Sequence, residues 1–351
     1  MITHKLNEIK QISDRVAVLR RGELAGIFDG AAVDVEKISC MMVNDEINPD
    51  KVSSFSFSAK NTFLEKSSIK KNSIISFENV TVCRQGQKRP LLDDVSFSVY
   101  SGEILGFAGV GGNGLGIIEA VLGGFLHPVS GKVLHRGKDI SNLSIGSLRK
   151  QGLAYVPADR VNVGSAADAT IEENIIINNR NELRLFQNFS FRKSFLGFIG
   201  KIGFKEDFSR AFFETKNLME KFGIEASDLS AKASTLSGGN LQKLILAREI
   251  NLIRDYFVFS EPTWGLDMAS SRFVKEEIKT LGKMGAAIIL ISANLDEIIE
   301  MSDRVIVMYR GKIAGVFNEI NASVKNAIAN CMQTSDNTQL DRSERKERTQ
   351  Q

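Results

Sequence analysis

An octapeptide of small and polar residues is the clearest chemical feature of this chain. It reads Leu236-Ser237-Gly238-Gly239-Asn240-Leu241-Gln242-Lys243. Its two glycines let backbone N–H groups approach an anion, and Ser237 can donate from its hydroxyl. Apolar residues continue at helical spacing to Ile250, which predicts a helix whose N-terminus adds partial positive charge. A serine-capped helix after a glycine turn is the simpler interpretation of the first residues.

A second glycine-rich turn lies between a predicted strand, Ile104–Ala108, and a predicted helix, Ile117–Leu122. The turn consists of Gly109, Val110, Gly111, Gly112, Asn113, Gly114, Leu115 and Gly116. Backbone amides cradle phosphates in this strand–turn–helix context. The glycines fit both the dinucleotide pattern G-x-G-x-x-G and the P-loop pattern G-x-x-x-x-G-K-[ST]. In the P-loop alignment Leu115 replaces the phosphate-binding lysine, and Gly116 replaces the hydroxyl that holds Mg²⁺.

Strands with apolar or alternating patterns are expected to position these turns. They are predicted at Ile74–Val82, Val95–Tyr100, Ile104–Ala108 and Ala286–Ser292, with further strands in the first parts of Gly152–Arg160 and Asp255–Asp267. Short apolar runs of this length are typical of strands buried in a sheet, and helical patterns separate several of them. The fold class predicted is therefore α/β.

The motifs together resemble those of ABC-type ATPases, in the form found in importers of simple sugars and nucleoside-like molecules. The octapeptide resembles the family's signature motif, which closes over the γ-phosphate of ATP held by a partner domain. Residues Asp255–Asp267 are similar to the Walker B strand and the D-loop. Their order after the octapeptide favours the P-loop alignment. The alternative is a nicotinamide-dependent oxidoreductase, with Asp139 near the acidic position of that pattern.

The resemblance implies roles for further residues. Glu261 stands at the position of the general base that orients water, and Ser260 at that of the Mg²⁺-binding aspartate. Asp267 acts across the dimer in the family, although it also fits as the N-cap of a helix from Met268 to Lys283. A sensor loop that faces the transmembrane partner in the family is matched by Pro157, Asp159 and Arg160. An ordinary turn at the end of a strand is the alternative there.

The N-terminal residues repeat a later segment of the chain. Asp14 matches Asp303, so the offset is 289. The matching segments are Ser13–Val18 with Ser302–Val307, and Arg21–Phe28 with Arg310–Phe317. The same offset places His4 opposite Ala293, where the family carries a histidine that contacts the γ-phosphate. We therefore predict that residues 1–43 are the C-terminal remnant of a first nucleotide-binding domain, with His4 as its catalytic histidine.

The remaining boundaries follow composition and motifs. Residues 44–72 are rich in Ser, Lys and Asn and are predicted to be a linker. Residues 73–332 are predicted to be the second nucleotide-binding domain. The resemblance implies a P-loop NTPase with a RecA-like core, an antiparallel β subdomain and a helical signature subdomain at about residues 165–250. Residues 333–351 are polar and charged, which predicts a disordered tail.

Composition narrows the function classes. The chain has 351 residues, of which 43% are hydrophobic and 25% charged, as expected for a globular protein. A net charge of +3 is too small to indicate nucleic acid as a partner. The three cysteines are scattered, which favours a reducing cytosol and suggests no metal site. No apolar run approaches the roughly 20 residues that span a bilayer, so we expect any membrane role to come through a partner.

Leu115, Gly116, Ser260 and Ala293 each replace a residue of the family's motifs, and all four positions belong to one nucleotide site. They predict an asymmetric pair: ATP and Mg²⁺ at a composite site that uses the signature motif, and a weak or empty degenerate site. The predicted function is the ATP-binding subunit of an importer of a sugar, nucleoside or similar solute, peripheral on the cytoplasmic face of the inner membrane. Its expected partners are the missing first domain, permease subunits and, indirectly, a solute-binding protein. An inactive remnant of a disrupted gene and an ABC-type protein acting on ribosomes are the alternatives.

Overall fold

The computed structural model describes residues 13–20, 23–29, 73–84, 86, 89–179, 212–252, 254–318 and 324–332. His4, the predicted linker and the predicted tail lie outside these residues. The chain divides into two compact units, residues 71–265 with 273–351, and residues 1–70 with 266–272. Among the described helices, none is long and apolar enough to cross a membrane.

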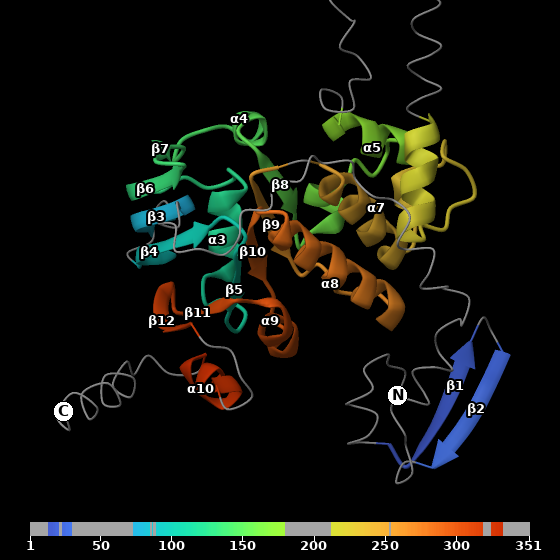
Figure 1. Ribbon diagram of the computed structural model, residues 1–351. Helices are drawn as coiled ribbons and strands as arrows, with labels where there is room; N and C mark the ends of the chain where they lie inside the picture. The colour runs from blue at the N-terminus through green and yellow to red at the C-terminus, as the bar shows by residue number, and fades with distance from the viewer. Residues whose placement is uncertain are drawn as a thin grey trace, which may run out of the picture. The chain divides into compact units, whose positions relative to one another are not determined.

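A six-stranded sheet forms the centre of the larger unit (Figure 1). Its order is β12 (Lys312–Phe317), β11 (Arg304–Tyr309), β5 (Ile104–Ala108), β10 (Ala287–Ile291), β9 (Tyr256–Ser260) and β8 (Leu153–Val156). All neighbours pair in parallel except the edge strand β12, which is antiparallel to β11. Every residue of β5, β9 and β10 is buried, as expected for parallel strands covered on both faces.

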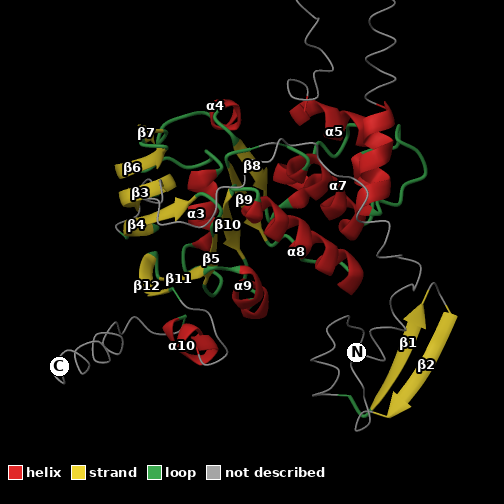
Figure 2. Ribbon diagram, viewed as in Figure 1, coloured by secondary structure: helices red, strands yellow, loops and turns green. Residues whose placement is uncertain are grey.

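A four-stranded antiparallel sheet packs over one face of this core, with helix α3 (Leu115–Leu122) between the two sheets (Figures 1 and 2). Its order is β4 (Leu92–Tyr100), β3 (Ser73–Val82), β6 (Ser130–His135) and β7 (Lys138–Asp139). Phe97 stacks on Phe77 at 4.4 Å between ring centroids and meets Phe107 of β5 edge-on at 4.9 Å. These rings join the antiparallel sheet to the strand that leads into the glycine-rich turn.

The opposite face of the parallel sheet carries α9 (Leu295–Met301), and α8 (Met268–Lys283) precedes β10 (Figure 2). Gly106 of β5 allows close packing, because a Cβ there would lie 3.0 Å from a methyl group of Ile298. Helix α4 (Ile145–Lys150) leads into β8, and α10 (Val324–Cys331) follows β12. The loops after β5, β8, β9 and β10 therefore meet at the carboxyl ends of adjacent parallel strands, where α/β folds bind ligands.

The helical part contains α5 (Ile171–Asn179), a helix at residues 212–222 and α7 (Gly238–Ile250). The capping box that starts α5 joins the Thr170 N–H to the Glu173 carboxylate at 2.8 Å, with the reverse bond at 3.1 Å. The predicted helix after the octapeptide is confirmed, but more of its surface is buried than the one-sided apolar pattern indicates. From Leu241 to Ile250 every side chain except that of Lys243 is buried, because α7 packs on several neighbours at once.

The smaller unit contains a hairpin of β1 (Arg15–Arg20) and β2 (Glu23–Asp29). Its strand register equals that of the β11–β12 hairpin when 289 is added to each number, and both hairpins contain a bulge at the same step. The matching features are the pairs Val16–Phe28 and Val305–Phe317, and the bulges after Val18 and Val307. The sequence repeat is therefore accompanied by the same local backbone geometry.

Candidate functional site

The glycine-rich turn after β5 leads directly into α3, as its sequence predicts. Gly114 is the N-cap residue of the helix with a left-handed φ of 107°, which glycine adopts without a steric penalty. Leu115, at the position of the P-loop lysine, is half-buried and packs against the hydrophobic core. Asn113 fixes the turn by accepting from the Arg310 N–H at 3.2 Å. The turn thus has exposed backbone at Gly111 and Gly112, and Leu115 makes an apolar contact with the core.

Glu119, on the second turn of α3, points toward the ends of β8 and β9. Its carboxylate accepts hydrogen bonds from the Ser260 hydroxyl at 2.7 Å, the Tyr155 hydroxyl at 2.7 Å and the Ala158 N–H at 3.1 Å. Ser260 is 2% exposed. The serine that stands at the Mg²⁺-aspartate position is therefore bound to a carboxylate from another element. Three protein donors already occupy this carboxylate.

Glu261 begins the turn after β9 with a left-handed φ of 48°. Its carboxylate accepts from the Ala293 N–H at 2.6 Å and the Ser292 hydroxyl at 3.3 Å. Burial raises the pKa of Glu261, the nearby Glu297 and Glu119 raise it further, and the hydrogen bonds from Ala293 and Ser292 oppose the shift. A carboxyl group at this strand end with a raised pKa has the environment of a general base.

The raised pKa of Glu261 predicts a pH-dependent stability effect. The folded protein holds the proton of the Glu261 carboxyl group more tightly than the unfolded chain does. The free energy of unfolding therefore falls as the pH rises from the pKa of Glu261 in the unfolded chain toward its higher pKa in the folded protein. Replacing Glu261 with Gln removes this penalty, and the variant is expected to have a higher Tm than the wild type at pH 7. The advantage should vanish below about pH 4, where both states are protonated. Thermal unfolding from pH 3 to pH 8 measures the difference in Tm between the variant and the wild type. Glu225→Gln, at an exposed position, is the control. A difference in Tm that does not change with pH would contradict the prediction.

The signature octapeptide forms the start of α7, and its polar residues divide into two groups. Ser237 is the N-cap, and its hydroxyl accepts from the Asn240 N–H at 3.3 Å. Ser237 and Gly238 are exposed. Gln242 is fully buried and donates to the Pro262 carbonyl at 3.0 Å, so it supports the turn after β9 rather than facing solvent. The exposed group is the part that can meet an anion.

The predicted sensor loop follows β8. Pro157 is buried, and Asp159 accepts from two backbone N–H groups of the π-helical turn that follows it. These contacts lower the pKa of Asp159, together with a hydrogen bond from the Asn162 side chain. Arg160 extends to the carbonyl groups of Gly238 and Trp264. The loop thus joins the signature turn to the turn after Glu261.

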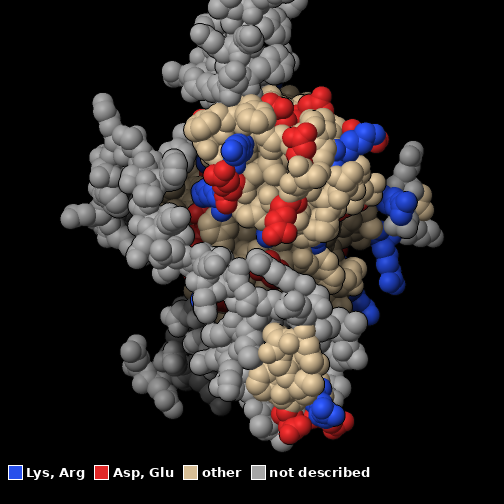
Figure 3. All heavy atoms as spheres, turned by 90° about the vertical axis from the view of Figure 1, so that its right-hand side faces the viewer, with Lys and Arg blue, Asp and Glu red and all other residues tan. Residues whose placement is uncertain are grey.

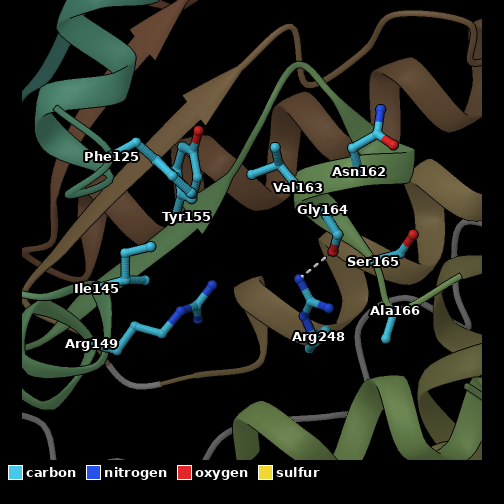
Figure 4. Close-up of a pocket in the computed structure, with 10 residues that line it drawn as sticks. All are labelled: Phe125, Ile145, Arg149, Tyr155, Asn162, Val163, Gly164, Ser165, Ala166 and Arg248. Atoms are coloured by element: carbon cyan, nitrogen blue, oxygen red, sulfur yellow. Dashed lines mark hydrogen bonds between the residues drawn. The ribbon is translucent and has the colours of Figure 1, made fainter.

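A cavity of about 340 Å³ lies beside this loop (Figure 4). Figure 4 shows Arg149 and Arg248 entering from α4 and α7, and the rings of Phe125 and Tyr155 side by side. The other lining residues are Ile145, Asn162, Val163, Gly164, Ser165 and Ala166. Both arginines bond to the fully buried Glu249, Arg149 through two nitrogens at 3.1 and 3.2 Å and Arg248 at 2.9 Å. The cavity therefore has a basic wall with one internal counter-charge.

Sequence reasoning missed Glu119 and the Arg149–Glu249–Arg248 cluster. Neither lies in a recognisable motif, and both depend on elements that are distant along the chain.

On the face shown in Figure 3, acidic and basic side chains of the described residues intermix. Asp267 accepts from the Ser270 N–H at 2.9 Å, which confirms its interpretation as a helix cap. The catalytic and binding roles of all these residues stay predictions.

Residues 92–264 match the ABC transporter family. A glucose import ATP-binding protein of Haloferax volcanii is 31% identical over 89% of this chain and 52% of its own length. A nucleoside import ATP-binding protein of Lactococcus lactis is 29% identical over 90% of this chain and 57% of its own. A galactose/methyl galactoside import ATP-binding protein of Fusobacterium nucleatum is 30% identical, with 90% and 57% covered. The chain spans little more than half the length of these relatives.

Solved structures share the fold. A dimeric ATP-binding cassette in a post-hydrolysis state with ADP and Pi has a TM-score of 0.56 and 19% identity, over 70% of this chain and 98% of that one. A nucleotide-free cassette from an ABC transporter has a TM-score of 0.54 and 21% identity, with 73% and 95% covered. The predicted α/β fold, with its P-loop, antiparallel sheet and helical part, is thereby confirmed. The chain contains an ATP-binding domain of the ABC transporter family, and the curated relatives it resembles are sugar and nucleoside import ATP-binding proteins.

Proposed function

We propose that this chain is the C-terminal part of the ATP-binding subunit of an importer for a sugar, nucleoside or similar small solute. One observation supports this most: the residues of the signature turn are exposed, whereas the residues at the lysine and Mg²⁺-aspartate positions are engaged by other parts of the protein. Ser237 and Gly238 are exposed at a helix N-terminus, whereas Leu115 packs into the core and Ser260 is bound by Glu119. The chain therefore presents a phosphate-closing surface and lacks the groups to process its own ATP.

The residues around the glycine-rich turn do not fit Mg²⁺-ATP. The lysine position is apolar, Gly116 has no hydroxyl, and the Glu119 carboxylate already accepts three hydrogen bonds from protein donors. We therefore assign no hydrolytic step to this site. The signature turn does fit an anion, because Ser237, Gly238 and Gly239 lie at the N-terminus of α7, a 13-residue helix. In this proposal a first domain holds the ATP, whose γ-phosphoryl group is transferred to water. Ser237, Gly238 and Gly239 of this chain bind that γ-phosphate from the opposite side.

The first domain is inferred from the repeat. The equal register and bulge position of β1–β2 and β11–β12 support a common origin for the two segments. On this basis we propose residues 1–43 as the end of a first nucleotide-binding domain, with His4 as its γ-phosphate histidine. Residues 44–72 would then be the linker, 73–332 the second domain and 333–351 the tail.

The remaining partners are proposed from the import proteins that this chain resembles. Permease subunits would meet the sensor loop and the adjoining cavity on the cytoplasmic face of the membrane. The Arg149 and Arg248 side chains give this cavity a basic character, and Phe125 adds an exposed apolar surface. A solute-binding protein would act only through the permease, because solute selection is separate from the ATPase chemistry.

Phosphate release tests the proposal. The chain alone is expected to show negligible turnover, and mixing it with a first ATP-binding domain that carries an intact P-loop should restore turnover. In the mixture, Ser237→Ala should lower kcat by about a hundredfold, since it removes a donor from the γ-phosphate. Ser234→Ala, a change at an exposed serine nearby, is the matched control. Substantial turnover by the chain alone, abolished by Glu261→Gln, would defeat the asymmetric-site proposal.

A further inference from the structure

Arg160 joins two turns that come from different parts of the sequence. One guanidinium nitrogen donates to the Gly238 carbonyl at 2.9 Å, and another donates to the Trp264 carbonyl at 2.5 Å. Gly238 begins the signature helix, and Trp264 lies in the turn that follows Glu261. A planar guanidinium can serve two acceptors at once, whereas the ammonium group of lysine acts as a single point of charge.

Glycines make room for this arrangement. Gly265 has a φ of +69°, and a Cβ at this position would lie 3.2 Å from the Arg160 guanidinium. A Cβ on Gly239 would lie 3.2 Å from the Gly265 carbonyl oxygen. The two turns therefore lie close together: a Cβ on Gly239 would crowd the Gly265 carbonyl, and a Cβ on Gly265 would crowd the Arg160 guanidinium. Arg160 bridges the turns at the place where they touch.

The charge of Arg160 is only partly compensated by these contacts. Both acceptors are backbone carbonyls, which carry partial rather than full negative charge. Burial lowers the pKa of Arg160. The guanidinium also lies at the N-terminal end of α7, where the helix dipole is positive. An anion arriving at the signature turn would meet this additional positive charge.

We propose that Arg160 is the positioning residue that holds the signature turn, Ser237–Gly239, and the turn at Trp264–Gly265 in one arrangement. The inference rests on the proposed function, because the composite ATP site is where this arrangement acts. With the two turns fixed to one another, they meet a nucleotide on the first domain as a single surface. Arg160 does not touch the reacting atoms; it acts through the backbone of the two turns.

The first test uses the chain alone. Arg160→Ala is expected to speed hydrogen exchange at the Asn240 and Leu241 amides about tenfold, because the hydrogen bonds that close the first turn of α7 open more readily. Trp264 is the only tryptophan of the chain, so its fluorescence anisotropy reports the second turn and should fall. Arg160→Lys should give intermediate values. Arg136→Ala removes an exposed arginine that pairs with Asp255, and it should change neither signal.

The second test uses the mixture with a first domain. Arg160→Ala should lower kcat about tenfold and leave the KM for ATP nearly unchanged, since the P-loop of the first domain holds most of the nucleotide. Guanidinium ion at millimolar concentration should restore part of kcat in Arg160→Ala and none in Ser237→Ala.

The outcomes separate the two proposals. Wild-type exchange and anisotropy in both Arg160→Ala and Arg160→Lys would overturn the positioning role, whatever the ATPase result. Should Arg160→Ala fail to fold, Arg160→Lys decides the same question. Absence of turnover in the wild-type mixture would overturn the proposed function, and the exchange measurements would still decide whether Arg160 fixes the two turns.

Discussion

Replacing Glu249 with Ala is expected to lower the free energy of unfolding by about 3–5 kcal/mol. Glu249 is fully buried, and its carboxylate accepts from both terminal nitrogens of Arg149, from Arg248 and from the Tyr155 N–H. Removing it leaves two guanidinium groups without their counter-charge, and Arg248 is only 5% exposed. Breaking a buried ion pair from one side costs more than the pair contributes when intact, because the remaining charges stay desolvated.

Urea denaturation at pH 7 measures this loss. The control is Asp168→Ala, which breaks the pair with Lys232 whose side chains are 97% and 60% exposed; less than about 1 kcal/mol is expected there. Burial alone would raise the pKa of Glu249, but Arg248 and Arg149 hold it below its ordinary value. A depressed acid pKa stabilises the folded state above the unfolded value, and this stabilisation is lost as pH falls through the folded value. The wild-type and variant curves should therefore converge in acid, and a difference below about 1 kcal/mol at pH 7 would contradict the assignment.

Replacing Ser260 with Asp is expected to destabilise the protein by about 3 kcal/mol. Ser260 is 2% exposed, and its hydroxyl lies 2.7 Å from the Glu119 carboxylate. A second carboxylate at that distance replaces a donor with a like charge in a buried position. The cost should shrink at low pH, where one of the two groups is protonated.

Pairing this change with Glu119→Gln provides a double-mutant cycle. The amide introduced by Glu119→Gln can donate to the carboxylate introduced by Ser260→Asp, so the double variant should be at least about 1.5 kcal/mol more stable than the sum of the single changes predicts. Denaturation of the four proteins measures the coupling. If the effects of the two single changes on the free energy of unfolding simply add in the double variant, Glu119 does not determine which residue is tolerated at position 260. Ser234→Asp, at an exposed position, controls for the added charge.

Local patterns predicted much of the fold because each reports a local physical preference. The run Ile104–Ala108 forms β5 with the predicted ends, since five buried residues in succession suit a parallel strand covered on both faces. The cap at Asp267 and the start of α7 at Gly238 follow from side chains that satisfy helix N-termini. Strand β4 begins at Leu92, earlier than the alternating pattern from Val95 indicates, because it pairs with β3 beyond that pattern.

The rest of the site depends on contacts between distant residues. Glu119 meets Ser260 across 141 positions and Arg149 meets Glu249 across 100. No periodicity or motif reports such pairs, because the sheet order alone brings their elements together. Gln242 illustrates the same limit within a motif: its type and spacing are those of the signature, yet its side chain is buried under Pro262.

The short loop after β8 is held at Ala158 and at Arg160, which are two residues apart, by groups of opposite charge. Glu119 holds the Ala158 N–H, and the neighbouring Arg160 holds Gly238 and Trp264. Because the two anchored residues lie so close along the chain, a shift of the loop backbone should act on both sets of contacts. A displacement of the loop should therefore be transmitted to α3 through Glu119 and to the signature turn through Arg160.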